Sequence, residues 1–161
     1  GSNTDWIGIR DAIGDAGSKA VVLGAGGAAA AAVYALRSLS LDITVLNRTV
    51  SAARDLAGRF GCESGPLEMF DRVSPDIVIN ATPVGMDPDT RSLLQQGQLK
   101  PSMTIFDLVY TPPDTPLIRM ARSARCRVIP GTELFVRQAA AQFRHFTGIS
   151  APLELVRSMI Q

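Results

Sequence analysis

Short runs of β-branched and other apolar residues alternate along the chain with longer segments rich in Ala and Leu. The short runs have the length of buried strands, and the longer segments have the length and spacing of helices. A repeated alternation of this kind predicts βαβ units around a parallel sheet. We expect six strands, at Ala20–Leu23, Ile43–Leu46, Cys62–Glu63, Ile77–Asn80, Thr104–Leu108 and Arg127–Ile129.

Helices are expected between these strands, at about 27–39, 49–60, 67–72 and 115–124. Thr49 and Thr115 are residues of the kind that cap a helix, and Pro116 is favoured at a first helical position. At the start of the chain, Trp6, Ile9 and Ile13 lie three and four positions apart. This spacing predicts one apolar face on a further helix.

The two ends of the chain complete the predicted architecture. Thr4 or Asp5 can cap the first helix, and Thr147–Gly148 closes a long amphipathic one that follows Gly131. A last helix follows Pro152, and no internal repeat or long linker divides residues 1–161. The sequence therefore predicts one doubly wound, Rossmann-type α/β domain with flanking and terminal helices. The apolar positions of the long helix are Leu134, Val136, Ala140, Phe143 and Phe146.

Composition narrows the function classes. At 46% hydrophobic and 19% charged residues, the chain is typical of a globular protein. Its longest uncharged stretch, Ala20–Leu36, is interrupted by glycines, so we expect no membrane span. The formal net charge of +1 gives no global field that would attract nucleic acid. The two cysteines, Cys62 and Cys126, are distant in sequence, which favours buried reduced thiols in a cytoplasmic protein. With His145 as the one histidine, the spacing of these residues predicts no metal site.

A glycine-rich turn follows the first strand directly. The segment Gly24-Ala25-Gly26-Gly27-Ala28-Ala29 matches the dinucleotide-binding fingerprint, with Ala at its last position. The first glycine permits the tight turn, the second lets a pyrophosphate approach the backbone, and the next helix offers its N–H groups to phosphate. The alternative interpretation is a turn that serves only close packing. Its place in a βαβ series favours nucleotide binding.

The second strand ends in polar residues that bear on the choice of cofactor. Asn47 stands 23 positions after Gly24, near the place where an NAD site has an acid for the ribose hydroxyls. Here Asn47, Arg48 and Thr49 occur instead, and an arginine can bind phosphate through two parallel hydrogen bonds. This favours NADP, although Arg48 could also be a surface arginine. Asp42 precedes the strand and is expected at the opposite edge of the sheet.

Six segments follow one another in a recognisable order. They are Asn3-Thr4-Asp5, Gly24 to Ala28, Asn47-Arg48-Thr49, Asn80-Ala81-Thr82-Pro83-Val84-Gly85-Met86, Asp107-Leu108-Val109-Tyr110 followed by Thr115-Pro116-Leu117, and Gly131 through Gln138-Ala139 to Gly148. This order resembles the shikimate dehydrogenase family, specifically its carboxyl-terminal NADP-binding domain, over essentially the whole chain. The resemblance implies NADP-dependent, reversible reduction of 3-dehydroshikimate to shikimate in aromatic amino acid biosynthesis.

The resemblance also implies roles for single residues. Asp5 matches the aspartate of a catalytic Lys–Asp pair, and Thr4, Tyr110 and Gln138 match substrate-binding positions. Leu108 and Gly131 match positions beside the nicotinamide, and Thr82 matches one on the adenosine side. Taken without the family, Asp5 or Thr4 is equally a helix cap, Tyr110 a boundary aromatic and Gln138 an exposed helix residue.

The lysine of that pair has no counterpart here. Only Lys19 and Lys100 occur, and neither is a credible partner for Asp5. In the family this lysine belongs to an amino-terminal domain that supplies most of the substrate pocket, so we expect this chain alone to bind cofactor with little or no turnover. The same polypeptide could carry that domain or other shikimate-pathway modules, a question that the sequence leaves open.

Two positions depart from the family pattern. Ala30 and Ala52 stand where many members carry a basic residue near the 2′-phosphate, which leaves Arg48 as the main phosphate contact, with Arg54 close enough in sequence to compensate. Two alternatives therefore remain open at this point. One is a non-catalytic regulatory module that binds a nucleotide or metabolite, and the other is a quinate/shikimate dehydrogenase that uses NAD.

Overall fold

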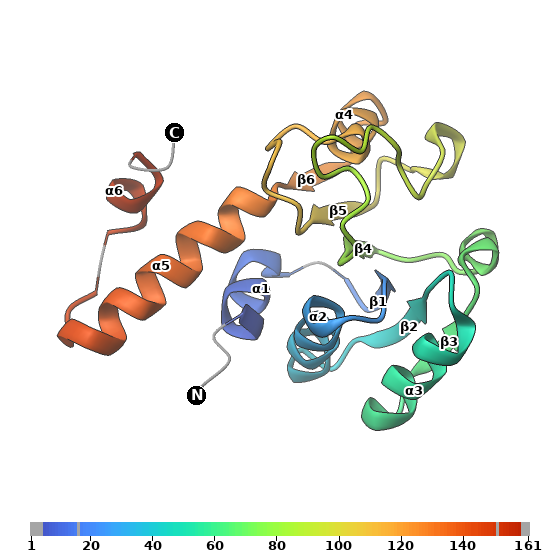
Figure 1. Cartoon of the computed structure of the whole chain (residues 1–161), viewed down its shortest axis with the longest axis horizontal. Helices are drawn as coiled ribbons and strands as arrows, with labels where there is room; N and C mark the ends of the chain where they lie inside the picture. The colour runs from blue at the N-terminus through green and yellow to red at the C-terminus, as the bar shows by residue number, and fades with distance from the viewer. Residues whose placement is uncertain (1–4, 16, 151, 159–161) are drawn as a thin grey trace.

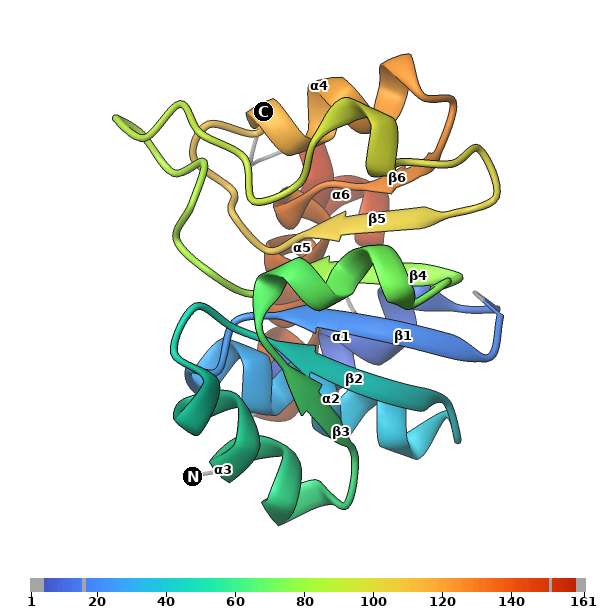
Figure 2. The same ribbon diagram turned by 90° about the vertical axis from the view of Figure 1, so that its right-hand side faces the viewer.

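Six parallel strands form one sheet in the part of the chain that the computed structural model describes, residues 5–15, 17–150 and 152–158. The sheet has the order β3-β2-β1-β4-β5-β6, so the chain moves outward from β1 in one direction and from β4 in the other (Figure 2). This is a doubly wound sheet, and it confirms the predicted fold class. The strands are β1 (Lys19–Leu23), β2 (Asp42–Leu46), β3 (Glu63–Gly65), β4 (Ile77–Asn80), β5 (Thr104–Asp107) and β6 (Arg127–Ile129).

Helices cover both faces of the sheet (Figures 1 and 2). One face packs against α1 (Asp5–Ile13), α2 (Gly27–Ser38) and α3 (Val50–Phe60). Against the other face lie the 3₁₀ helix η1 (Leu67–Arg72), the loop that contains η2 (Gln96–Gln98), and α4 (Pro116–Ser123). The long helix α5 (Gly131–Thr147) packs against α1, and α6 (Leu153–Ser158) packs against α5.

The central strands are apolar throughout because both faces are covered. Val21, Val22 and Leu23 in β1 are all fully buried, although they alternate between the two layers of the core. Continuous apolar runs of this kind are typical of parallel strands that are covered on both faces. The same rule explains why the sequence located β1, β2 and β4 to within a residue.

Several predicted boundaries are corrected by the structure. The strand expected at Cys62–Glu63 begins one residue later and extends to Gly65, and β5 ends at Asp107, which leaves Leu108 in the following loop. The helix expected at 67–72 is a 3₁₀ helix, in which the Met69 amide donates to the Pro66 carbonyl three residues earlier at 3.1 Å. The short segment η2 was not predicted.

The two capping predictions have different outcomes. Thr115 caps α4, because its hydroxyl accepts a hydrogen bond from the Ile118 amide at 3.2 Å. Thr49 occupies the capping position of α3, but its side chain makes no capping hydrogen bond within the described structure. The two cysteines are unpaired thiols as expected, yet Cys62 and Cys126 are half-buried rather than buried.

Only the first part of α5 buries its predicted apolar face. Val136 is 1% exposed, whereas Phe143 is 46% and Phe146 83% exposed. The helix ends as predicted, with Gly148 in a left-handed conformation at φ 72°. Among the described helices, none is long and apolar enough to cross a membrane.

Candidate functional site at the carboxyl edge of the sheet

The order of the strands reverses between β1 and β4, and this point lies at the edge where all six strands end. In doubly wound folds the crevice at such a switch point is the usual ligand site. Most predicted residues after β1, β2, β4, β5 and β6 lie at this edge, in the loops or at the helix starts that follow the strands, and Gln138 lies further along α5. The sequence argument and the topology therefore indicate the same region.

The turn after β1 requires its first glycine. Gly24 has φ 111°, which side chains rarely adopt, and a Cβ there would lie 2.9 Å from Thr82 Cγ2 and 3.0 Å from the Ala81 carbonyl oxygen. Its amide donates to the Leu46 carbonyl at 2.8 Å. The turn is thus held tightly between the ends of β2 and β4.

The next two glycines face open space instead. A Cβ at Gly26 or Gly27 would meet no heavy atom of the described residues within 4 Å. Gly26 caps α2, and no side chain in the described structure hydrogen-bonds to the start of this helix. The start of α2 therefore presents backbone N–H groups that an anion can bind. Ala25 is half-buried beside this turn.

A cavity of about 310 Å³ opens beside the turn on the β2 side. Asn47, Arg48 and Thr49 line it, together with Thr82 from the loop after β4. The Asn47 amide donates to the Thr49 carbonyl at 3.0 Å and so fixes the shape of the loop. The remaining lining residues are Leu67, Pro83, Val84, Asp89, Arg91 and Leu93.

A second cavity of about 160 Å³ lies on the β5 side of the turn. It brings together six residues singled out from the sequence, which are far apart along the chain: Asp5, Ala28, Leu108, Tyr110, Gly131 and Gln138. The Gln138 side-chain amide donates to the Asp5 carboxylate at 2.7 Å. Tyr110 is 55% exposed and stacks on Phe135, with the ring centroids 6.2 Å apart.

Gly131 is necessary for the packing around this second cavity. A Cβ at this position would overlap the Val109 carbonyl and lie 2.9 Å from the Leu108 carbonyl oxygen. The start of α5 therefore rests directly on the backbone that follows β5. This contact sets the position of the cavity wall to which Leu108 and Gly131 both contribute.

A buried polar network that the sequence argument missed connects the loops after β4 and β5. Asp107 is fully buried, and its carboxylate accepts hydrogen bonds from the Asn80 amide group at 2.9 Å, the Val109 amide at 3.1 Å and the Thr115 hydroxyl at 2.6 Å. Asn80 in turn accepts from the Thr82 hydroxyl at 2.7 Å. Burial raises the pKa of Asp107 above its ordinary value, despite these hydrogen bonds. The sequence did contain a signal for this network, because Asn80 and Asp107 are polar residues at the ends of the adjacent buried strands β4 and β5.

Other predicted residues lie outside the two cavities. Thr4 is outside the described residues. Arg54 is exposed on α3 and is not part of either cavity wall, so the structure gives no support to its expected compensating role. Lys100 is exposed and also lies outside both cavities, as does Lys19 at the amino end of β1.

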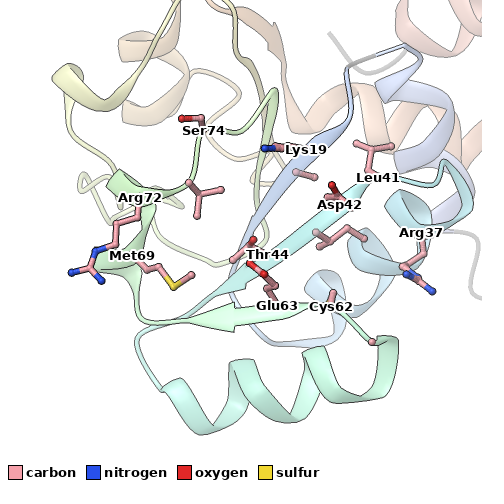
Figure 3. A pocket seen from close by; sticks show the side chains of 14 residues that line it. Lys19, Arg37, Leu41, Asp42, Thr44, Cys62, Glu63, Met69, Arg72 and Ser74 are labelled. Carbon is pink, nitrogen blue, oxygen red and sulfur yellow. The ribbon is translucent and has the colours of Figure 1, made fainter.

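A hollow of about 690 Å³, larger than either of these two cavities, lies at the opposite, amino edge of the sheet (Figure 3). Lys19, Arg37 and Arg72 line it together with Asp42 and Glu63. Asp42 pairs with Lys19 at the first position of the β1–β2 ladder, which confirms its expected place away from the glycine turn. No group of three or more His, Cys, Asp or Glu residues that could hold a metal occurs among the described residues.

The fold and the glycine turn at its switch point define an α/β domain of the dinucleotide-binding, Rossmann type. The chain belongs to the shikimate/quinate 5-dehydrogenase family, whose model matches residues 10–115. A second model, the shikimate 5′-dehydrogenase carboxyl-terminal domain, matches residues 131–158. These matches confirm the resemblance inferred from the six segments.

Individual relatives agree with this assignment. The NADP(+) shikimate dehydrogenase of Methanocella arvoryzae is 40% identical over an alignment of 165 positions that covers 96% of this chain and 61% of the relative. The structure of shikimate 5-dehydrogenase from Thermus thermophilus in complex with NADP(H) and shikimate is 34% identical, with a TM-score of 0.88 over 98% of this chain and 61% of that one. Quinate dehydrogenase from Corynebacterium glutamicum in complex with NAD is 29% identical, with a TM-score of 0.90 over the same shares. The chain thus spans about three fifths of the length of these relatives.

Proposed function

We propose that this chain binds NADP and forms the cofactor domain of an enzyme that interconverts 3-dehydroshikimate and shikimate. One observation carries the proposal. The glycine turn adjoins two cavities, since Thr82 beside Gly24 lines one and Ala28 lines the other. The cavity on the β2 side is lined by Asn47, Arg48 and Thr49 rather than by an acid at the end of β2. The family and the NADP-binding relatives described above support this assignment.

The residues present fit the parts of NADP. The open space over Gly26 and Gly27, at the start of α2, suits a pyrophosphate. The Arg48 guanidinium suits the 2′-phosphate, because it can donate two parallel hydrogen bonds. The smaller cavity, with Leu108 and Gly131 in its wall, suits a flat apolar ring. When bound, NADP supplies or accepts the hydride of the reaction.

The substrate end of the proposed site depends on Asp5. Asp5 lies in the first turn of α1, and the Gln138 side-chain amide orients its carboxyl group through a 2.7 Å hydrogen bond. Such a carboxylate can orient a substrate hydroxyl and also the basic group that accepts the proton of this hydroxyl. We assign the contacts with substrate hydroxyl and carboxylate groups to Tyr110, Gln138 and Thr4.

The rest of the substrate site is proposed to come from a second domain of the kind that the relatives possess. Within the part of the chain that is described, no lysine lines the cavity that contains Asp5. We therefore expect this chain alone to turn over little or no shikimate. Its location in the cytoplasm and fusion to other modules of the pathway stay predictions. A regulatory module without catalysis is not favoured, because the family match and the Asp5–Gln138 contact both point to the enzyme.

The proposal is tested by calorimetric titration of this chain with NADPH and with NADH, each repeated with Arg48→Ala. We expect NADPH to bind at least tenfold more tightly, a gap of about 1.4 kcal/mol, and the gap to disappear in the variant. Arg54→Ala is the matched control, since Arg54 is also an exposed arginine near the start of α3 but lies outside the cavity. A wild-type chain that binds neither nucleotide up to millimolar concentration would reject the proposal, and a chain that prefers NADH would favour the NAD-using alternative.

A further inference from the structure

The cavity on the β2 side is lined by a second arginine, which no sequence motif marks. Arg91 belongs to the long connection between β4 and β5, and it lines the same cavity as Arg48, which comes from the loop between β2 and α3. The two arginines therefore line one cavity from two separate loops.

Asp89 holds Arg91 in a defined orientation. The Arg91 side chain donates from Nε to Asp89 Oδ1 at 2.9 Å and from Nη2 to Oδ2 at 2.8 Å, and the Arg91 backbone amide also donates to Oδ1 at 2.9 Å. These contacts with Arg91 lower the pKa of Asp89 to about 2, so the carboxylate is charged at neutral pH. A two-pronged contact of this kind fixes the plane of the guanidinium.

Arg91 keeps donors available for a ligand. Two of its five side-chain N–H groups are used by Asp89, and the others have no partner among the described residues. The Arg91 side chain is 77% exposed. Arg48 likewise forms no ion pair or side-chain hydrogen bond with any described residue and is exposed. The charged residues in the described lining are thus Arg48, Arg91 and Asp89, which give the cavity wall a net positive charge.

We infer that Arg91, oriented by Asp89, is a second phosphate-binding residue that helps this chain select a nucleotide with a phosphomonoester on the adenosine ribose. The inference rests on the proposed function. Arg48 and Arg91 are the two basic residues in the described lining of this cavity, and Ala30 and Ala52 add no charge near it. The β4–β5 connection thus supplies a second positive charge from a separate loop, through a residue that no local motif marks.

The test is a titration of Arg91→Ala with NADPH and NADH. We expect a loss of about tenfold in NADPH affinity and a change of less than twofold for NADH, because only the 2′-phosphate distinguishes the two. Arg91→Lys keeps the charge but not the two-pronged contact with Asp89, so it should recover part of the loss. Arg122→Ala is the matched control, since Arg122 on α4 forms a similar exposed pair with Asp114 in the preceding loop, outside the cavity.

The outcomes separate this inference from the proposed function. If wild type prefers NADPH and Arg48→Ala removes the preference, but Arg91→Ala leaves it unchanged, only the inference is wrong. It is also wrong if Arg91→Ala weakens both nucleotides equally, which would mean that the residue shapes the cavity without reading the phosphate. A wild-type chain without nucleotide binding overturns both. Thermal unfolding of each variant checks that the exposed substitutions leave the fold intact.

Discussion

Asp107 ends β5 with a carboxyl group that is fully buried and shared by three donors. Because Thr82 lines one cavity and Leu108 the other, the network through Asn80 and Asp107 ties both walls of the candidate site to the ends of two strands. A buried group of this kind is expensive to disturb, since each donor left unsatisfied costs about 1–3 kcal/mol.

Asp107→Asn should make the stability of the chain depend on pH in a different way. The pKa of Asp107 is raised in the folded state from its ordinary value of 3.8, so the folded protein holds the proton more tightly than the unfolded chain. The tighter proton binding by Asp107 stabilises the folded state fully below pH 3.8, and this contribution is lost as the pH rises through the raised pKa. The wild-type advantage over Asp107→Asn in free energy of unfolding should therefore be largest at low pH and shrink toward neutrality.

This difference is measured by urea unfolding of both proteins at a series of pH values between about 3.5 and 7. The series begins near the ordinary pKa of an aspartate and runs upward, in the direction of the shift. Asp114→Asn, an exposed loop aspartate, serves as the control. A difference between wild type and Asp107→Asn that stays constant over the range would contradict the raised pKa.

Single residues were predictable where a motif or a strand end marked them. Asp5 and Gln138 lie 133 positions apart, and the resemblance to the family selected both before the structure brought them within 2.7 Å. Asp89 and Arg91 carried no such signal, because their place in the cavity depends on how a long loop returns to the sheet. The capping bond expected at Thr49 is absent from the described structure, and Asn47 orders that loop instead.

At the scale of elements, two helix starts use glycine for opposite reasons. Gly26, at the start of α2, faces open space, whereas Gly131, at the start of α5, is pressed against the Val109 backbone. The first arrangement leaves room for a ligand, and the second brings a helix close to a strand end.

Alanine at these two positions should therefore produce separable effects. Gly131→Ala should lower the free energy of unfolding by about 1–3 kcal/mol, the usual range for overpacking. Gly26→Ala should change stability by less than about 1 kcal/mol, because its φ of −88° is accessible to alanine, yet weaken NADPH binding at least tenfold by occupying the space for phosphate. Chemical denaturation and calorimetric titration of both variants measure the two effects. The reverse pattern would show that the glycine turn serves packing alone.

Elements were predictable to the extent that burial determines the local sequence. β1 and β4 are apolar at nearly every position because both their faces are covered, so their runs are plain in the sequence. β3 and η1 lie toward one side of the sheet and carry exposed polar residues. The bounds predicted for β3 were therefore less accurate, and η1 was predicted as a helix without its 3₁₀ type. For α5 the spacing predicted the helix and its end but not that Phe143 and Phe146 would be exposed.

At the scale of the whole molecule, the sheet has two edges with different character. The carboxyl edge holds the glycine turn and the two cavities that contain most of the predicted site residues. The amino edge holds the larger hollow of Figure 3, which contains none of them. The alternation of strands and helices predicted this division, because parallel strands place all their carboxyl ends together.

The central claim is that the carboxyl edge binds NADP, and the most direct test is a map of amide chemical shifts during titration of the isotope-labelled chain with NADPH. We predict the largest changes at Gly26, Gly27, Arg48 and Thr82, with smaller ones at Leu108 and Gly131, and none at Lys19, Arg37 or Cys62 around the hollow of Figure 3. Changes centred on that hollow, or no changes at saturating NADPH, would contradict the claim.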